Sequence, residues 1–248
     1  MLEDYKIHVE ERLQQGIPPL PLNAEQVSEL VELLKSPPPA EEEYVLDLIT
    51  NRTPAGVDPA AYIKAAFLTD VAKGDASCPL IDRKHATKLL GTMLGGYNVE
   101  SLIKLLEDDE VGSLAADGLS KTLLMFNAKH DVIELAERNI NAKKVVDSWS
   151  NAEWFTNKPK LPDVIKAIVF RVEGEINTDD LSPAPDAPSR PDIPLHALAM
   201  LKKTMEDPLE KIEKLKESNL PIVFVGDVVG TGSSRKSATN SLLWHIGE

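Results

Sequence analysis

A short stretch near the end of the chain combines residue types that bind anions. Residues 228–240 read VVGTGSSRKSATN, follow the apolar run LPIVFVG and lead into a stretch with helical character. A loop that leaves a strand and opens a helix points backbone N–H groups outward, and the helix dipole favours negative charge there. Gly230 and Gly232 permit a close backbone approach, and Arg235 offers a planar fork for a carboxylate or a phosphate. The sequence therefore predicts an anion site here.

Two nucleotide-binding motifs nearly fit this stretch. A Walker A loop reads G-x-x-x-x-G-K-[ST], whereas Gly230 to Ser237 reads G-T-G-S-S-R-K-S, with Arg235 where the second glycine belongs. The dinucleotide fingerprint G-x-G-x-x-G fails at the same position. Both mismatches weaken a nucleotide-binding interpretation. A plain strand–helix turn with capping serines and a solvated Arg235–Lys236 pair remains the simplest alternative.

The composition excludes several classes of protein. The 248 residues are 42% hydrophobic and 27% charged, as in a soluble globular protein, and the net charge of −13 argues against general nucleic-acid binding. Cys78 is the single cysteine, which excludes an intrachain disulfide or a cysteine-ligated cluster built from this chain alone and suits the cytoplasm. No apolar run reaches the roughly 20 residues of a membrane helix, and the five histidines lack metal-ligand spacing.

The first part of the chain carries helix signals throughout. Asn23 opens a capping box with Gln26, and one apolar stripe follows at helical spacing: Val27, Leu30, Val31 and Leu34. Asp58-Pro59 starts another helix, which Gly74 ends. About eight short helices and no strand are expected before residue 157. We predict a HEAT-like superhelix, with an irregular helical bundle as the alternative.

The pattern changes after a polar linker, NKPKLP. The segment VIKAIVFRVEG reads as a strand that Gly174 ends, and a long loop with five prolines follows. Helices are expected after Asp192 and from Asp207, before a second buried strand, LPIVFVG. This region is α/β, but two strands make an unfinished sheet. We therefore divide the chain into 1–157 and 158–248 and expect further strands from elsewhere.

Separated stretches of this sequence resemble the bacterial aconitase B family. They are DLITNRTPAGVDPAAYIKAAFL, LLGTMLGGYNV, NTDDLSPAPDAPSRPDIPLHALAMLK and GDVVGTGSSRKSATNSLLW, which agree with the family in order and span essentially the whole chain. The resemblance implies a HEAT-like helical domain followed by the first part of a swivelling α/β domain. It also implies a hydro-lyase that interconverts citrate and isocitrate through aconitate in the tricarboxylic acid cycle.

The resemblance implies roles for four residues. In the family, G-S-S-R supplies a serine base and an arginine for a substrate carboxylate. On this chain Ser234 would be the base, Ser233 would hydrogen-bond the substrate, and Arg235 would clamp a carboxylate. Arg190, in PSRPD, resembles the second substrate arginine. The expected anion is thus a carboxylate of a tricarboxylate rather than a nucleotide phosphate, with citrate, isocitrate and methylated relatives all open.

The family's chemistry needs a cofactor that this chain is not expected to hold. The resemblance implies a [4Fe-4S] cluster whose three cysteines lie in domains that would follow Glu248, and Cys78 does not match them. We expect no cluster or metal on this chain, dependence on the missing C-terminal domains, and no catalysis by the chain alone. Other partners implied by the family are a homodimer through the helical domain and mRNA, with no membrane.

Two other functional classes remain open. A non-catalytic helical interaction or dimerisation module fits the extended surface of a helical array. A nucleotide-binding protein would need affinity for ATP or GTP with magnesium.

The two arginines carry a geometric prediction. If the strands expected at 165–173 and 221–226 are parallel neighbours, the loops that follow them leave the same edge of the sheet. Arg190 and Arg235 could then meet one anion, with Arg235 held near the helix start and Arg190 more mobile.

Overall fold

The computed structural model describes residues 1–122, 124–190 and 192–247, which fall into two compact units. Residues 1–8 and 19–159 form the first, here called the helical unit, and residues 9–18 and 160–248 form the second, the α/β unit. Each is described by itself below. No described helix is both long enough and apolar enough to cross a membrane.

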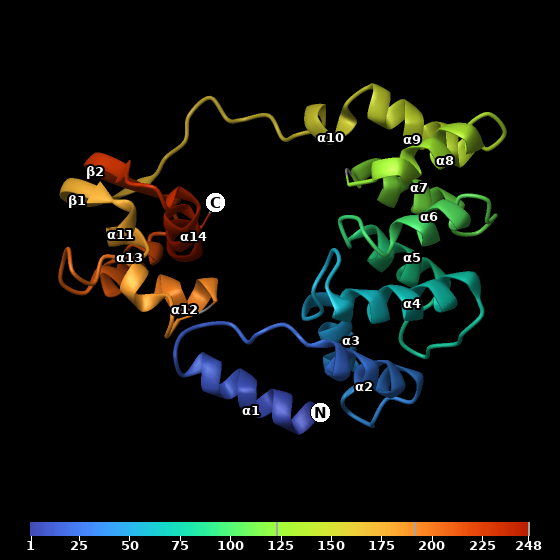
Figure 1. Ribbon diagram of the computed structural model, residues 1–248, viewed down its shortest axis with the longest axis horizontal. Coiled ribbons are helices and arrows are strands. Elements are labelled where there is room, and N and C mark those ends of the chain that lie inside the picture. The colour runs from blue at the N-terminus through green and yellow to red at the C-terminus, as the bar shows by residue number, and fades with distance from the viewer. Residues whose placement is uncertain (123, 191, 248) are drawn as a thin grey trace. The chain divides into compact units, whose positions relative to one another are not determined.

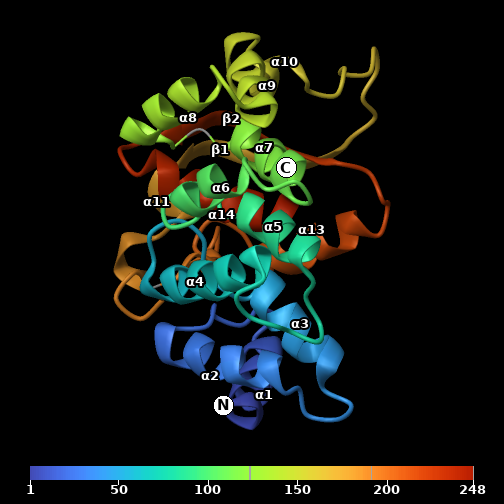
Figure 2. The same cartoon turned by 90° about the vertical axis from the view of Figure 1, so that its right-hand side faces the viewer.

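The helical unit is a succession of short helices (Figures 1 and 2). Neighbours pack in turn, α2 on α3 and α4, α4 on α5, α5 on α7, and α7 on α9. The one β-type pairing among the described residues before 150 is an isolated bridge between Gly95 and Leu124, so the predicted helical character is confirmed. The elements up to residue 156 are α1 (Leu2–Leu13), of which residues 9–13 belong to the α/β unit, α2 (Ala24–Lys35), α3 (Glu42–Asn51), α4 (Pro59–Lys73), α5 (Arg83–Gly91), α6 (Val99–Leu105), α7 (Gly112–Lys121), the 3-10 helix η1 (Phe126–Ala128), α8 (Lys129–Leu135), α9 (Ile140–Ser150) and α10 (Glu153–Thr156).

The helix boundaries follow local capping chemistry. Asn23 Oδ1 accepts the Gln26 N–H and Gln26 Oε1 accepts the Asn23 N–H, both at 2.9 Å, so the predicted capping box is present. Asp58 caps α4 through the N–H of Ala60 at 2.8 Å, and Gly74 ends that helix with φ 85°. The predicted apolar stripe of α2 is fully or nearly fully buried.

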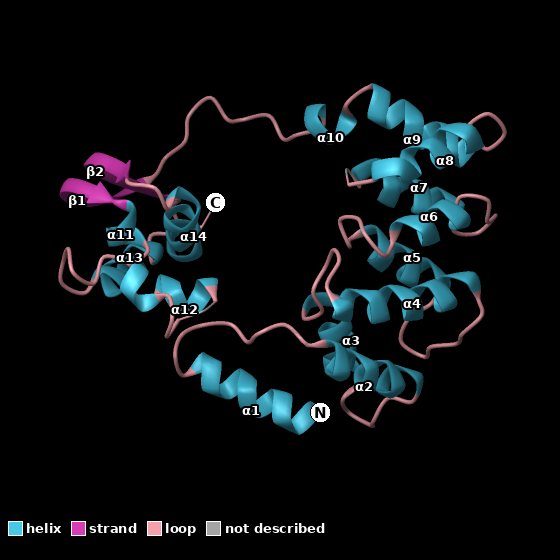
Figure 3. Ribbon diagram, in the orientation of Figure 1, coloured by secondary structure: helices cyan, strands magenta, loops and turns pink. Residues whose placement is uncertain are grey.

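The α/β unit is built around a two-stranded parallel sheet (Figure 3). Its elements are β1 (Ile168–Asn177), α11 (Thr178–Leu181), the 3-10 helix η2 (Ala184–Asp186), α12 (Ile193–Ala197), α13 (Pro208–Lys216), β2 (Ile222–Thr231) and α14 (Arg235–Ile246). The strands pair from Ile168 with Ile222 to Asn177 with Thr231. One core holds this unit together: Phe170, Val172, Ile176, Leu181, Met200, Leu201, Ile212, Ile222 and Ala238.

Both strands are longer than predicted. The expectation that Gly174 ends the first strand is wrong, because β1 continues through a register shift between Val172 and Glu175 and buries Ile176. Gly174, at φ 81°, makes the irregularity within the strand rather than its end. The segment expected to be an irregular Pro-rich loop therefore begins with the end of β1 and with α11. β2 likewise runs past Gly226.

The spacing of Leu195, Leu198 and Leu201 predicts a helix that continues from Asp192 to Leu201, but the helix that forms is shorter. α12 stops at Ala197, and Leu201 adopts φ 58°, which no helix accommodates. Leu201 is nevertheless fully buried in the core, so the apolar spacing that suggested a longer helix reflects burial of a turn.

One face of the sheet carries exposed valines. Phe170, Val172 and Ile222 face the core, whereas Val169, Val223 and Val225 lie on the opposite face and are each at least a third exposed. An apolar surface of this kind is unusual on a completed sheet, which agrees with the expectation that two strands are only part of one.

Candidate functional site

A three-residue connection joins β2 to α14. Gly232, Ser233 and Ser234 follow Thr231, the last residue of the strand, and Arg235 is the first residue of the helix. Ser234 occupies the N-cap position, where its carbonyl oxygen accepts the Ala238 N–H at 3.1 Å. The glycine-rich stretch therefore ends at a helix N-terminus, as an anion site requires.

Gly232 fits where no larger residue could. Its φ is 103°, in the left-handed region that favours glycine, and a Cβ there would lie 2.5 Å from Thr178 Oγ1. Thr178 opens α11 directly after β1. The turn before α14 thus packs against the end of the neighbouring strand, which fixes where Ser233 and Ser234 lie.

The serine hydroxyls are exposed and make no hydrogen bond to any described residue. The expectation of capping serines is thus only half met, since Ser234 stands at the N-cap but its side chain does not cap the helix. The N–H groups of Lys236 and Ser237 also lack a partner in the described part of the chain. Free hydroxyls beside free N–H groups at the start of a 12-residue helix can hold an anion.

The two predicted arginines differ in their surroundings. Arg235 is exposed and forms no ion pair with a described residue. Arg190 is about one-third exposed, donates from Nη1 to the Leu195 carbonyl at 3.1 Å, and has its Nε 3.8 Å from Asp186 Oδ1. Arg235 is therefore free to meet a ligand, whereas Arg190 is held by its own loop. Their relative mobility stays a prediction.

The segments that carry the two arginines border one small cavity. It measures about 170 Å³ and is lined by Ser182, Asp192, Ile193, His196, Ser237, Asn240 and Ser241. Asp192 lies two residues beyond Arg190, and Ser237 lies two residues beyond Arg235. Because β1 and β2 are parallel, their carboxyl ends share one sheet edge, and α12 packs on α14. Neither arginine lines the cavity, so a shared anion site stays a prediction.

The acidic pair in NTDDLSPA serves the local turn. Asn177 Oδ1 accepts the N–H groups of Asp179 and Asp180, and Asp180 Oδ2 accepts the Asn177 N–H at 2.9 Å. Asp180 Oδ1 also accepts the Thr204 hydroxyl at 3.1 Å. Asp180 therefore caps the local turn.

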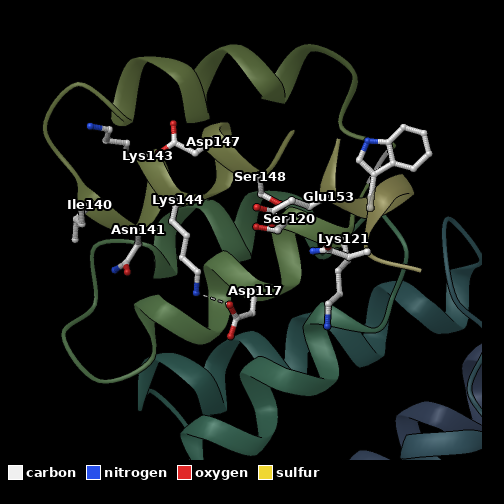
Figure 4. A pocket seen from close by; sticks show the side chains of 12 residues that line it. Asp117, Ser120, Lys121, Ile140, Asn141, Lys143, Lys144, Asp147, Ser148 and Glu153 are labelled. Carbon is white, nitrogen blue, oxygen red and sulfur yellow. Dashed lines mark hydrogen bonds and ion pairs between the residues drawn. The ribbon is translucent and has the colours of Figure 1, made fainter. Parts of the chain in front are cut away.

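A larger cavity lies in the helical unit and is distant in sequence from these residues. It measures about 1050 Å³ and opens beside α7 and α9, with Trp154 and several lysines at its walls (Figure 4). The Lys144 ammonium pairs with Asp117 at 2.6 Å, and Ser148 donates to Glu153 at 2.8 Å. Four of the lining side chains thus pair with one another, as is common in a surface groove.

The family of the chain follows from its matches. Residues 4–155 match the family described as Aconitate B N-terminal domain, and residues 167–248 match Aconitate hydratase 2 N-terminus. The chain belongs to the aconitate hydratase B family. Both the helical array and the β2–α14 turn fall within the matched ranges.

In the aligned stretch, more than half of the residues of this chain are identical to those of several bacterial proteins. It is 58% identical to Aconitate hydratase B of Pseudomonas aeruginosa, 59% to that of Synechocystis and 56% to that of Escherichia coli. All of this chain is covered in each comparison, but only 29–30% of each relative. The chain thus spans about a third of the length of these relatives.

The family's iron–sulfur cluster does not fit the residues of this chain. Cys78 is the single cysteine, and its thiol donates to the Leu34 carbonyl at 3.3 Å in the helical unit. The described residues contain no group of three or more potential metal ligands. The family resemblance implies a cluster held by three thiolates, and the one thiol of this chain does not supply them.

Sequence reasoning missed several residues around the small cavity. Ser182, Asp192, His196 and Asn240 line it, and Arg12 contacts Asp192 from the other end of the chain. Ser182 and Asp192 flank the quoted Arg190 motif and could have been considered on that ground. Nothing in the local sequence around Arg12 signals its distant partner.

Proposed function

We propose that this chain is the N-terminal part of an aconitate hydratase that interconverts citrate and isocitrate through cis-aconitate in the cytoplasm. The observation that carries the proposal is the free Ser234–Arg235 pair at the start of α14, placed at the carboxyl end of β2. The family membership and the identity of 56–59% to Aconitate hydratase B of three bacteria support it.

The proposed substrate carries three carboxylates, and the site offers matching charges. Arg235 binds one carboxylate through its planar fork, and the unpartnered N–H groups of Lys236 and Ser237 add the positive end of the helix dipole. Arg190 binds a second carboxylate when its loop meets the substrate. Ser233 donates a hydrogen bond to the bound molecule. These groups orient the substrate carbon toward Ser234.

Ser234 is the proposed proton carrier. In dehydration its Oγ, as the alkoxide that the family resemblance implies, takes the proton from the substrate carbon, while the substrate hydroxyl leaves as water with a proton from an acid of the full-length enzyme. In hydration Ser234 returns its proton to the carbon. A serine hydroxyl is a weak base near neutral pH and needs activation by neighbouring groups. No described residue hydrogen-bonds to it, so the activating groups belong to the rest of the full-length enzyme. The [4Fe-4S] cluster of the family belongs there as well, and this chain's part is binding and proton transfer.

The helical unit has a second proposed role, as an interaction module. We propose that residues 1–157 form a HEAT-like domain and residues 158–248 an incomplete swivel domain. The large groove beside α7 and α9, with its exposed Trp154, supports binding of a macromolecule by the helical domain, either a second copy of the chain or mRNA. The exposed valines of the sheet support completion of the α/β unit by further strands.

The nucleotide-binding alternative has less support. β2 includes Gly230 and Thr231, so only three residues connect the strand to α14, and Arg235 begins the helix where a Walker loop has glycine. Calorimetric titration with ATP or GTP and magnesium would reveal any such affinity.

Substitution of Arg235 tests the proposed function. In the full-length enzyme, we expect Arg235→Lys to raise the KM for isocitrate by about 10- to 100-fold, because lysine cannot bind a carboxylate with a planar fork. Lys236→Arg, at the next exposed position, is the matched control and should leave the KM unchanged. An unchanged KM for Arg235→Lys would contradict the assignment of the carboxylate clamp.

A further inference from the structure

Arg12 is a buried arginine near the N-terminus that none of the proposed steps uses. Its side chain is 8% exposed. Nε donates to the Pro18 carbonyl at 2.8 Å, while Nη1 and Nη2 donate to Asp192 Oδ2 and Oδ1 at 3.0 and 2.9 Å. Both partners of this two-pronged ion pair belong to the α/β unit. Burying a guanidinium is costly unless it is well paired. Here each of the three guanidinium nitrogens of Arg12 donates a hydrogen bond.

Asp192 links Arg12 to the N-terminus of α12. Its Oδ1, which also accepts from Arg12, accepts the Leu195 N–H at 3.0 Å and so caps the helix. The Arg12 hydrogen bond lowers the pKa of Asp192, which keeps the carboxylate ionised. Arg12 therefore holds the residue that positions the first turn of α12.

Leu195 connects that turn to Arg190. The Leu195 N–H is held by Asp192, and the carbonyl of the same residue accepts from Arg190 Nη1 at 3.1 Å. The Arg190 Nη2 has no hydrogen bond to a described residue, so that edge can meet a ligand. The direction of the Arg190 guanidinium thus depends on where the first turn of α12 lies.

We propose that Arg12 is a positioning residue for Arg190, acting through Asp192 and Leu195 to aim that guanidinium at a substrate carboxylate. The inference rests on the proposed function of Arg190. A two-pronged arginine–carboxylate pair fixes rotation as well as distance, which a lysine at position 12 could not do. The hydrogen bonds run from the Arg12 guanidinium to the Asp192 carboxylate. They continue through the backbone of Leu195 to the Arg190 guanidinium.

Steady-state kinetics of the full-length enzyme test this inference. We expect Arg12→Lys to raise the KM for isocitrate by about tenfold, because a small displacement of a positioning group costs that much or more, with kcat changed by less than about threefold. In an Arg190→Ala background the same substitution should leave the KM at the value of Arg190→Ala alone, because the residue it positions is gone. A purely structural role would instead raise the KM by the same factor in both backgrounds, and that result would overturn the inference.

Asp192→Asn is a second test, which remains informative if Arg12→Lys impairs folding. Asparagine is a good N-cap, so α12 keeps its cap while the charged pair with Arg12 is lost. We expect the same KM increase as for Arg12→Lys, and no further increase when the two are combined. Independent, multiplying effects would contradict the proposed path through Asp192.

The matched control is Arg138→Lys, which alters an exposed ion pair with Glu107 in the helical unit. Its KM should equal that of the unmodified enzyme. The failure of the proposed function gives a different pattern. If Arg190→Ala itself leaves the KM unchanged, Arg190 does not bind substrate. Both the proposed role of Arg190 and the inference that Arg12 positions it are then wrong. If Arg190→Ala raises the KM but Arg12→Lys does not, only the role of Arg12 is wrong.

Discussion

Ser234 and Lys64 show two ways in which a single side chain departs from its usual surroundings. Ser234 takes the N-cap position without capping, so its hydroxyl stays exposed and available. Lys64 is 3% exposed in α4, and its ammonium has one partner, the Thr50 carbonyl at 3.3 Å in the last turn of α3. The exposed hydroxyl of Ser234 fits its proposed role in proton transfer, whereas the buried ammonium of Lys64 affects stability.

Burial lowers the pKa of Lys64 to about 8. The unfolded chain binds this proton up to about pH 10.4, so between about pH 8 and pH 10 the unfolded state carries more protons than the folded one. The free energy of unfolding therefore gains a contribution from Lys64 that rises with pH in this window. At pH 7 both states are protonated, and the charged form is destabilised by desolvation.

Replacement of Lys64 by methionine should remove this penalty. We expect Lys64→Met to raise the free energy of unfolding at pH 7 by about 1–3 kcal/mol, since the neutral thioether needs no partner. The gain should shrink between pH 8 and pH 10. Urea unfolding at several pH values measures both effects, with exposed Lys104→Met as control. A destabilised variant at pH 7 would show that the contact of Lys64 with α3 outweighs its desolvation.

At the scale of the elements, helix packing depends on small residues that the sequence pattern does not explain. Gly91 was expected to end its helix, and it is the last residue of α5. It also lies against Gly118 of α7, so close that a Cβ on Gly118 would be 2.9 Å from the Gly91 Cα. The two glycines let the backbones of α5 and α7 approach directly.

Gly118→Ala should separate these helices. Alanine favours a helix by about 1 kcal/mol over glycine, but an added methyl against a backbone atom forces the helices apart at a cost of about 1–3 kcal/mol. Because the contacting atom is backbone, we expect a net loss of unfolding free energy. Ser113→Ala, exposed on the same helix, is the control and should be neutral or slightly stabilising. Stabilisation by Gly118→Ala would contradict the close packing of α5 on α7.

Local signals predicted the elements better than their extents. Asn23 and Asp58 were recognised as caps because a cap needs only a few neighbouring residues, and each accepts a backbone N–H at the start of its helix. Gly174 was misread as a strand end, because a glycine that makes a bulge and one that ends a strand look alike in sequence. Whether β1 continues is decided by burial of Ile176 in the core.

The candidate site was predictable in part. The motif around Ser234 and Arg235 follows from local chemistry and from the family resemblance. The contact of Arg12 with Asp192 joins residues 180 positions apart, and no periodicity or turn signal spans that distance. A contact between residues so far apart in sequence becomes visible only in the three-dimensional structure.

At the scale of the whole molecule, an exposed segment connects the helical unit to the α/β unit along the chain, at residues 154–166. Residues 154–166 are all exposed, and residues 157–167 contain no helix or strand. Two lysines in this segment offer trypsin sites, Lys160 and Lys166, whereas the bond after Lys158 is protected by Pro159. Exposed irregular segments are the preferred sites of proteolysis.

Brief trypsin treatment should therefore cut this segment first. We expect two products that divide near residues 158–166, identified by intact mass, while the lysines within α2 to α9 resist longer. Lys160→Gln and Lys166→Gln together should abolish the early cut. Earlier cleavage inside either unit would contradict the predicted division into 1–157 and 158–248.

The central claim is that this chain supplies the proton carrier of an aconitate hydratase. The most direct test is the kcat for isocitrate dehydration by full-length enzyme carrying Ser234→Ala, compared with Ser237→Ala on the same helix, at matched iron content. We predict a loss of about 10²–10⁴-fold for Ser234→Ala, the usual contribution of a positioned acid or base, and a KM within a few fold of the unmodified enzyme. A kcat for Ser234→Ala equal to that of the unmodified enzyme would contradict the account.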